Sequence, residues 1–168
     1  MAENKIDQLA AKKLYPADLN DILEKFGHLL QVYKELPDRD SIYGSYRRTL
    51  KCLDVLFPLK EHPIHGKTGL HAIEKYDDDG YVCRYSYSWK IIVPRQGVQL
   101  NHISSWGNDP HNSPGTPPEF IIETEPHHHH HVPGNRRIRK ENWDIHTLDE
   151  AFTFVKFYIE SGEEYKGR

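Results

Sequence analysis

The chain has 168 residues, 28% of them charged, and a formal net charge of −3. This charge excludes the bulk basic field that drives non-specific binding to nucleic acid, but it does not exclude a local basic patch. The aromatic residues (Trp 3, Tyr 10, Phe 6) supply enough apolar area for a core, so the composition excludes a disordered chain.

The two cysteines, Cys52 and Cys83, form neither a CxxC pair nor a disulfide framework. We therefore expect two buried thiols in a cytoplasmic, reducing environment. The N-terminal segment lacks the apolar region of a signal peptide, and no apolar run reaches the length of a membrane span. Residues 1–15 are expected to form a mobile lead-in, and residues 16–168 a single domain.

Two helices are predicted before the first strand. Apolar residues recur with a period near 3.6 between Pro16 and Pro37, which predicts an amphipathic helix. A second helix is expected over residues 41–56 for the same reason. Its apolar positions are Ile42, Tyr43, Tyr46, Leu50, Leu53 and Leu56. Its basic residues Arg47, Arg48 and Lys51 are interpreted as a solvated surface or as a contact for an acidic partner or RNA.

Strands are predicted in the middle of the chain. Residues 68–76 are expected to be extended, and Asp79-Gly80 predicts a hairpin turn. Residues 81–93 alternate, with Tyr85, Tyr87 and Trp89 on one face and Ser86, Ser88 and Lys90 on the other. This pattern predicts a half-buried antiparallel strand, whose aromatic face we interpret as core rather than as a stacking platform for bases. Further strands are expected over residues 98–106 and 120–124.

The C-terminal part ends in a well-marked helix. Residues 136–140 are expected to form a short basic strand or loop. Thr147 and Glu150 form a capping box, and Gly162 is a typical residue to end the helix that follows. The order of elements indicates an α+β fold, in which an antiparallel meander packs against two N-terminal helices and one C-terminal helix.

Five consecutive histidines, His127–His131, precede this last helix. In an extended chain His127, His129 and His131 share one face, whereas His128 and His130 share the other. Imidazole is a general acid or base near neutral pH and also a good ligand for zinc, nickel or copper. The first three are therefore candidate catalytic residues and the other two candidate metal ligands. A solvated sheet edge without a role is the third interpretation.

A second candidate region is the loop that follows the strand over residues 98–106. Asp109 and His111 are candidate catalytic residues, because a carboxylate can orient a histidine and fix its tautomer. Asn108 and Asp109 are also typical of an ordinary turn. The candidate substrate-binding residues are Trp106 and Asn108, together with the cations Arg84, Arg136, Arg137 and Arg139, which could contact phosphate.

Three segments occur in a particular order: YSYSW at 85–89, WGNDPH at 106–111 and PHHHHH at 126–131, followed by an amphipathic helix. This arrangement resembles the TumE-like toxin family of prokaryotic toxin–antitoxin systems over roughly residues 68–161. The second segment departs from the family pattern, because one acidic residue is displaced and Asn112 replaces a histidine. The resemblance implies a small α+β protein, a ribonuclease-like toxin controlled by an antitoxin protein.

These observations give three functional hypotheses. The first is an RNA-cleaving or RNA-binding domain, in which His111 and one or two residues of the histidine segment supply the acid and the base and no cofactor is required. The second is a metal-binding or metal-dependent hydrolytic domain that binds zinc or another divalent metal through the same histidines with Asp109 or Glu125. The third is a non-enzymatic module for protein interaction.

Overall fold

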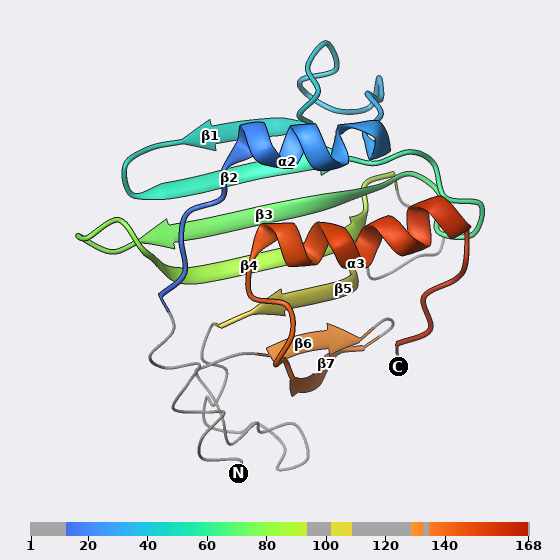
Figure 1. Cartoon of the computed structure of the whole chain (residues 1–168). Coiled ribbons are helices and arrows are strands. Elements are labelled where there is room, and N and C mark those ends of the chain that lie inside the picture. Colours follow the sequence, from blue (N-terminus) through green and yellow to red (C-terminus); the bar gives the residue numbers. More distant parts are fainter. Residues whose placement is uncertain (1–12, 94–101, 109–128, 133–134, 168) are drawn as a thin grey trace.

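The computed structural model describes residues 13–93, 102–108, 129–132 and 135–167, with the backbone alone for 129–132 and 135–141. Seven strands in these ranges form one antiparallel sheet, and their order in space follows their order in the chain (Figure 1). They are β1 (Ser45–Arg48), β2 (Cys52–Pro58), β3 (Thr68–Tyr76), β4 (Val82–Ile91), β5 (His102–Gly107), β6 (His129–Val132) and β7 (Asn135–Glu141). The predicted α+β class and antiparallel meander are confirmed.

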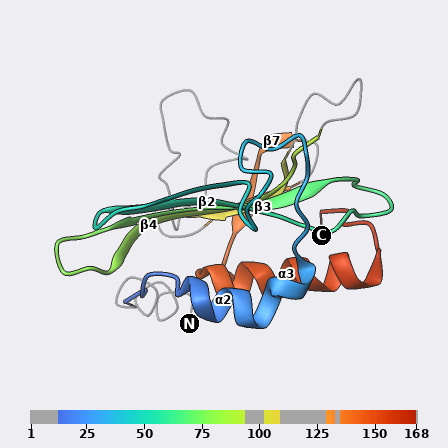
Figure 2. The same ribbon diagram turned by 90° about the horizontal axis from the view of Figure 1, so that it is seen from above.

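Two α-helices in these ranges, α2 (Leu19–Phe26) and α3 (Leu148–Ser161), cover the same face of the sheet (Figure 2). A short 3-10 turn, η1 (Gly27–Leu29), follows α2. The rings of Phe26 and Phe152 stack between the helices with centroids 4.9 Å apart. We call the opposite side of the sheet the helix-free face. Neither helix has the length and apolar character needed to cross a membrane.

The predicted helix over residues 41–56 is wrong, because strands β1 and β2 occupy this segment. Leu53, Val55 and Phe57 alternate along β2 and are fully buried against the helices. This period-two pattern gives β2 a buried face, and pairing with β3 satisfies its backbone groups. The apolar residues of this segment also fit a helical period, but that period does not match the residues that are buried in the structure.

The first predicted helix is also shorter than expected. It begins after the N-cap Asp18 and gives way to η1 at Gly27. Leu30 has an extended backbone and forms a β-bridge with Leu59, which ties the chain to the end of β2. The described chain therefore has two α-helices where three were predicted.

The core lies between the helices and strands β2 to β5. Tyr85, Tyr87 and Trp89 are buried there, which confirms that the aromatic face of β4 is core. The expectation of two buried thiols is wrong, since Cys52 is half-buried and Cys83 is exposed, both as free cysteines. Most of the predicted lead-in, the strand over residues 120–124 and part of the strand over 98–106 lie outside the described residues.

Helix α3 begins and ends as predicted. The hydroxyl oxygen of Thr147 accepts a hydrogen bond from the Glu150 N–H (3.2 Å), and the Glu150 carboxylate accepts one from the His146 N–H (3.1 Å). Gly162 ends the helix with a φ of 73°, a conformation that favours glycine. The caps set the ends of α3, and its buried residues Leu148, Ala151, Phe152 and Val155 pack it against the sheet.

Candidate functional site

Only part of the predicted site falls within the described chain. Asp109, His111, His127 and His128 lie outside it. His129, His130 and His131 lie in β6, and the arginines at 136, 137 and 139 lie in β7, with their backbones described. The structure gives register partners for four of these residues, His129, His130, His131 and Arg139.

The register of β6 separates the histidines between the two faces. His130 pairs with Trp106, which contacts Phe154 of α3 and so belongs to the helix-covered face. His129 pairs with Gly107 and His131 with Ser105, and both positions belong to the helix-free face. The row that contains His131 continues through Ser105 and Ser88 to His71 on β3.

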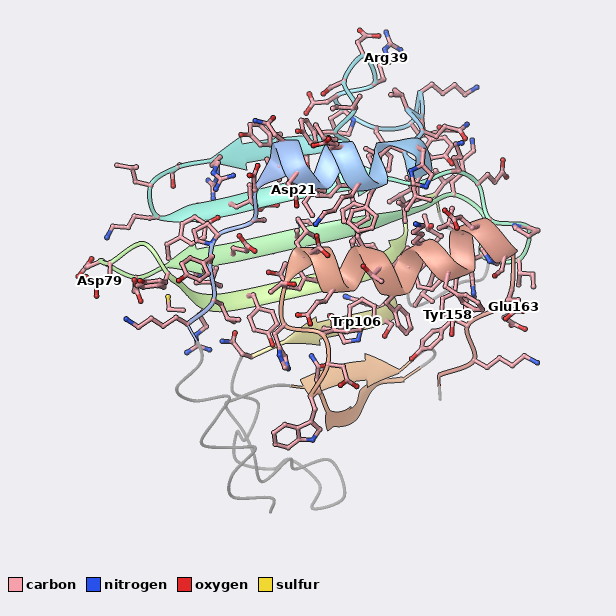
Figure 3. All side chains as sticks on the ribbon, viewed as in Figure 1. Asp21, Arg39, Asp79, Trp106, Tyr158 and Glu163 are labelled. Atoms are coloured by element: carbon pink, nitrogen blue, oxygen red, sulfur yellow. The ribbon has the colours of Figure 1, made fainter. Side chains whose placement is uncertain are left out.

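The structure describes the side chains of two predicted substrate-binding residues, Trp106 and Asn108. Trp106 is 3% exposed and lies beside α3, with its ring centroid 4.9 Å from that of Phe154 (Figure 3). The Asn108 side chain accepts a hydrogen bond from the Tyr85 N–H (2.9 Å) and donates one to the carbonyl of Cys83 (3.1 Å). Trp106 is thus part of the core, and Asn108 joins the end of β5 to β4.

The helix-free face carries a histidine–carboxylate pair that the sequence reasoning did not identify. His71 on β3 pairs with Leu56, and Asp54 on β2 pairs with Ile73, so the two are diagonal neighbours on one face. The Nε2 atom of His71 lies 2.7 Å from Oδ1 of Asp54. The two side chains are 22% and 41% exposed, so the pair is accessible without being fully solvated.

A lysine completes this group. The Nζ atom of Lys90 on β4 lies 3.1 Å from Nδ1 of His71. Because an ammonium group only donates hydrogen bonds, Nδ1 accepts here and the neutral ring carries its proton on Nε2, which donates to Asp54. Partial burial lowers the pKa of Lys90, and the negative charge of Asp54 opposes this effect. Asp54, His71 and Lys90 form what we call the relay.

The neighbours of the relay are polar. Ser88 and Ser105 are buried on the helix-free face and their hydroxyl groups share a hydrogen bond of 2.9 Å. Half-buried His102 pairs with Lys90 across the β4–β5 ladder. A histidine whose two ring nitrogens contact a carboxylate and a cation has its tautomer and orientation fixed, as a general base requires.

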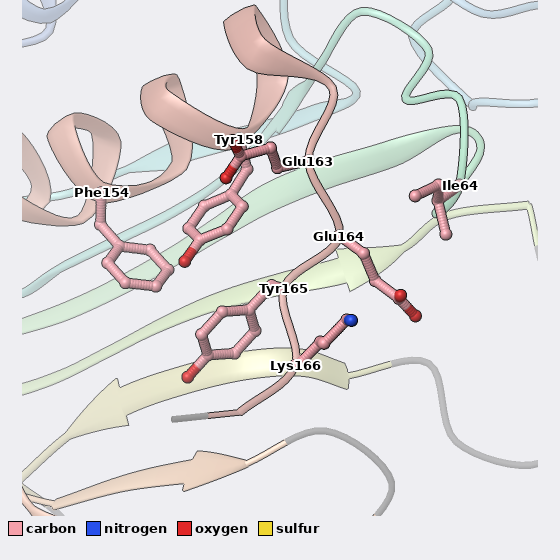
Figure 4. Close-up of a pocket in the computed structure, with 7 residues that line it drawn as sticks. All are labelled: Ile64, Phe154, Tyr158, Glu163, Glu164, Tyr165 and Lys166. Atoms are coloured by element: carbon pink, nitrogen blue, oxygen red, sulfur yellow. The ribbon is translucent and has the colours of Figure 1, made fainter.

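A pocket beside α3 is a different kind of site. A cavity of about 530 Å³ lies between α3, the C-terminal segment and Ile64, with Phe154, Tyr158 and Tyr165 in its wall (Figure 4). The nearby His62 is buried, with Nδ1 accepting from the N–H groups of Ile64 and His65 and Nε2 donating to the carbonyl of Glu163. Its hydrogen-bonding capacity is used by the backbone, so we assign it a structural role.

Among the residues whose side chains are described, no three of His, Cys, Asp or Glu lie close enough together to hold a metal ion. The predicted ligands His128 and His130 are not among those side chains. No family model, curated protein or solved structure matches the chain. The site is therefore interpreted from its own geometry.

Proposed function

We propose that this chain cleaves RNA by histidine acid–base chemistry at the relay of Asp54, His71 and Lys90. The observation that supports this proposal is a partly exposed histidine held between a carboxylate at 2.7 Å and an ammonium at 3.1 Å. The ribonuclease activity implied by the resemblance to TumE-like toxins agrees with this chemistry. The proposal uses His71, whereas the sequence alone pointed to His111.

In the proposed reaction His71 is the base. The Lys90 ammonium leaves Nδ1 for a non-bridging phosphate oxygen, where it stabilises the charge that develops at phosphorus. The freed lone pair of Nδ1 takes the proton of the ribose 2′-OH as the 2′-oxygen attacks phosphorus. Asp54 then stabilises the imidazolium that forms, because it already accepts the Nε2 proton.

The bond from phosphorus to the 5′-oxygen then breaks, and this oxygen takes a proton from a second group. The products are a 2′,3′-cyclic phosphate and a free 5′-hydroxyl, so atoms and charge balance without a further reactant. We propose His131 or His129 as the acid, because their register positions lie on the same face as His71. His131 is three strand spacings from His71, about 14 Å, which leaves room for a phosphodiester between two histidines.

The test is cleavage of a fluorescent RNA oligonucleotide by tag-free protein with and without EDTA. We expect His71→Ala to lower kcat at least about 100-fold, the lower end of the effect of general acid–base groups. Asp54→Asn should also lower kcat, because the imidazolium that forms in the reaction loses its stabilising charge. A 2′-deoxy residue at the cleaved position should block the reaction.

Two matched controls define the outcome. His28→Ala removes a histidine that also contacts a carboxylate, Glu160 at 3.0 Å, but it lies beside the helices and should leave kcat unchanged. His130→Ala should cost less activity than His129→Ala and His131→Ala combined, since its register position lies on the other face. Full activity of a folded His71→Ala variant contradicts the proposal, and loss of cleavage with EDTA favours a metal-dependent reaction.

A further inference from the structure

An apolar surface borders the relay on the helix-free face. Leu56 on β2 pairs directly with His71, which places their Cβ atoms about 5 Å apart. Ile92 follows the end of β4, and both Leu56 and Ile92 are half-buried. The two side chains converge over Gly69, which pairs with Lys90 and is two residues from His71 along β3. A Cβ at Gly69 would meet Cδ1 of Leu56 at 2.8 Å and Cγ2 of Ile92 at 3.1 Å.

A third side chain continues this surface towards β1. Leu36, in the segment before β1, is also half-buried. A Cβ at Gly44 would lie 3.0 Å from Cδ1 of Leu36 and 3.1 Å from Cδ2 of Leu56, so the two leucines converge on the same glycine. We call Leu36, Leu56 and Ile92 the apolar shelf. Its aliphatic groups occupy the space that side chains at the two glycines would otherwise fill.

The orientation of His71 determines which part of a substrate meets the shelf. Nε2 faces Asp54, which pairs with Ile73, whereas Nδ1 faces Lys90, which pairs with Gly69. The nitrogen that takes the proton therefore lies at the Gly69 end of the relay, beside the shelf. In the proposed reaction this proton comes from the nucleotide on the 5′ side of the cleaved bond. The base of that nucleotide is attached to the same ribose as the attacking 2′-OH, so it can reach the shelf.

We infer that the apolar shelf binds the base of the nucleotide whose 2′-OH attacks phosphorus, so that the substrate carries an unstacked base at this position. This inference rests on the proposed function. The side chains of the shelf have no hydrogen-bonding groups, so they contact the face of the base rather than its edge and accept each of the four bases. Contact with the base holds the ribose beside Nδ1 of His71. A duplex does not fit, because its bases are covered by their neighbours in the stack.

The experiment compares a substrate that has this base with one that lacks it. Both are oligonucleotides with a single ribonucleotide among 2′-O-methyl nucleotides, so only one bond can be cleaved, and in the second the ribonucleotide is abasic. The variant Leu56→Ala/Ile92→Ala removes most of the shelf, and Ile92→Ala alone makes a smaller change to the sheet. Ile73→Ala is the matched control, because Ile73 is half-buried on the same face but at the Asp54 end of the relay.

We expect the double variant to lower kcat/KM for the complete substrate at least about 5-fold, the lower end of the contribution of one stacked base. Its kcat/KM for the abasic substrate should be unchanged, and Ile92→Ala should act in the same direction with a smaller effect. A loss of folded protein affects both substrates equally, so the ratio of the two kcat/KM values reports on the base. An equal loss with both substrates, or the same change of the ratio in Ile73→Ala, overturns the inference.

Binding separates a failure of this inference from a failure of the proposed function. With 2′-deoxyribose at the single position neither oligonucleotide can react, and Kd is measured by fluorescence anisotropy. Binding that depends on the base and on the shelf, in a protein that cleaves no RNA, refutes the proposed function alone. Cleavage that depends on His71 but not on the base refutes the inference alone. A protein that neither binds nor cleaves these strands refutes both.

Discussion

Replacement of the buried Glu74 is the sharpest test of how this fold is stabilised. Its side chain is 1% exposed and accepts three hydrogen bonds on the helix-covered face. Oε1 accepts from the Ala17 N–H and the Tyr76 hydroxyl, both at 3.0 Å, and Oε2 accepts from the Tyr87 hydroxyl at 2.5 Å. One carboxylate thus joins the segment before α2 to strands β3 and β4.

The loss of stability expected on replacing Glu74 follows from these contacts. In Glu74→Gln the amide oxygen can still accept the two hydrogen bonds that Oε1 accepts in Glu74. The amide nitrogen takes the place of Oε2 and cannot accept the hydrogen bond from the Tyr87 hydroxyl. A hydrogen bond to a charged group contributes about 1.5–3 kcal/mol, and removing the buried charge recovers a part of that. We expect a loss of about 2 kcal/mol for Glu74→Gln. Glu74→Ala leaves all three donors unpaired and creates a cavity, so we expect about 4 kcal/mol.

Urea denaturation followed by circular dichroism measures both values, with the m-value as a check that the unfolded state is unchanged. For a chain of this size about 2 kcal/mol corresponds to a Tm lower by roughly 4–8 °C. Exposed Glu164→Gln is the control for the charge alone and should change the unfolding free energy by less than about 0.5 kcal/mol. A Glu74→Gln protein as stable as the control would refute the reasoning.

Two further predictions concern pH and glycine. Burial raises the pKa of Tyr33 from 10.0 to about 12, and it also raises the pKa of Tyr87, so these tyrosines ionise at lower pH in the unfolded chain than in the folded one. The stability that is present below pH 10 should therefore be lost between pH 10 and 12, by up to about 1.4 kcal/mol per pH unit for each tyrosine. A constant urea midpoint over this range would contradict the prediction. Gly162→Ala places a Cβ 3.1 Å from Cγ of Pro63 at a φ of 73° and should lower the free energy of unfolding by about 1–2 kcal/mol. Gly27→Ala meets nothing within 4 Å at a φ of −57° and should raise the free energy of unfolding by up to about 1 kcal/mol. Thermal unfolding should therefore show a lower Tm for the first variant and a higher Tm for the second.

The features that local patterns determine were predictable. The aromatic face of β4 and the caps of α3 depend on neighbouring residues, and the structure confirms both. Strand β2 was not predictable in this way, because its leucines fit a helical period as well as an alternating one. Only the pairing of β2 with β3 decides between the two, and that pairing depends on residues about 20 positions away.

The relay was missed for the same physical reason. His71 is separated in sequence from Asp54 by 17 residues and from Lys90 by 19, and two strand pairings bring the three together. One signal was available: Lys90 was assigned to the polar face of its strand, and His71 interrupts an apolar run in the strand over residues 68–76. Asp54 could not be added while its segment was interpreted as a helix.

The register between β3 and β4 depends on one extra residue, Cys83. Tyr76 pairs with Val82 but Lys75 pairs with Arg84, so Cys83 is a bulge without a partner in the ladder. Counting from the hairpin turn without this bulge would pair His71 with Tyr87 and move the aromatic face out of the core. The bulge therefore reconciles the turn with the buried face of β4.

Deletion of single residues from β4 tests this argument. Deleting Cys83 leaves Val82 and Arg84 consecutive and both pairings intact, so it should cost about 1–2 kcal/mol, mainly the hydrogen bond that its carbonyl accepts from Asn108. Deleting Ser86, three residues further along, instead reverses the faces on one side of the deletion and exposes either Tyr85 or Tyr87 and the residues beyond it. That protein should lose more than about 4 kcal/mol or fail to fold. Equal stability of the two deletion variants in urea denaturation would show that the bulge does not set the register.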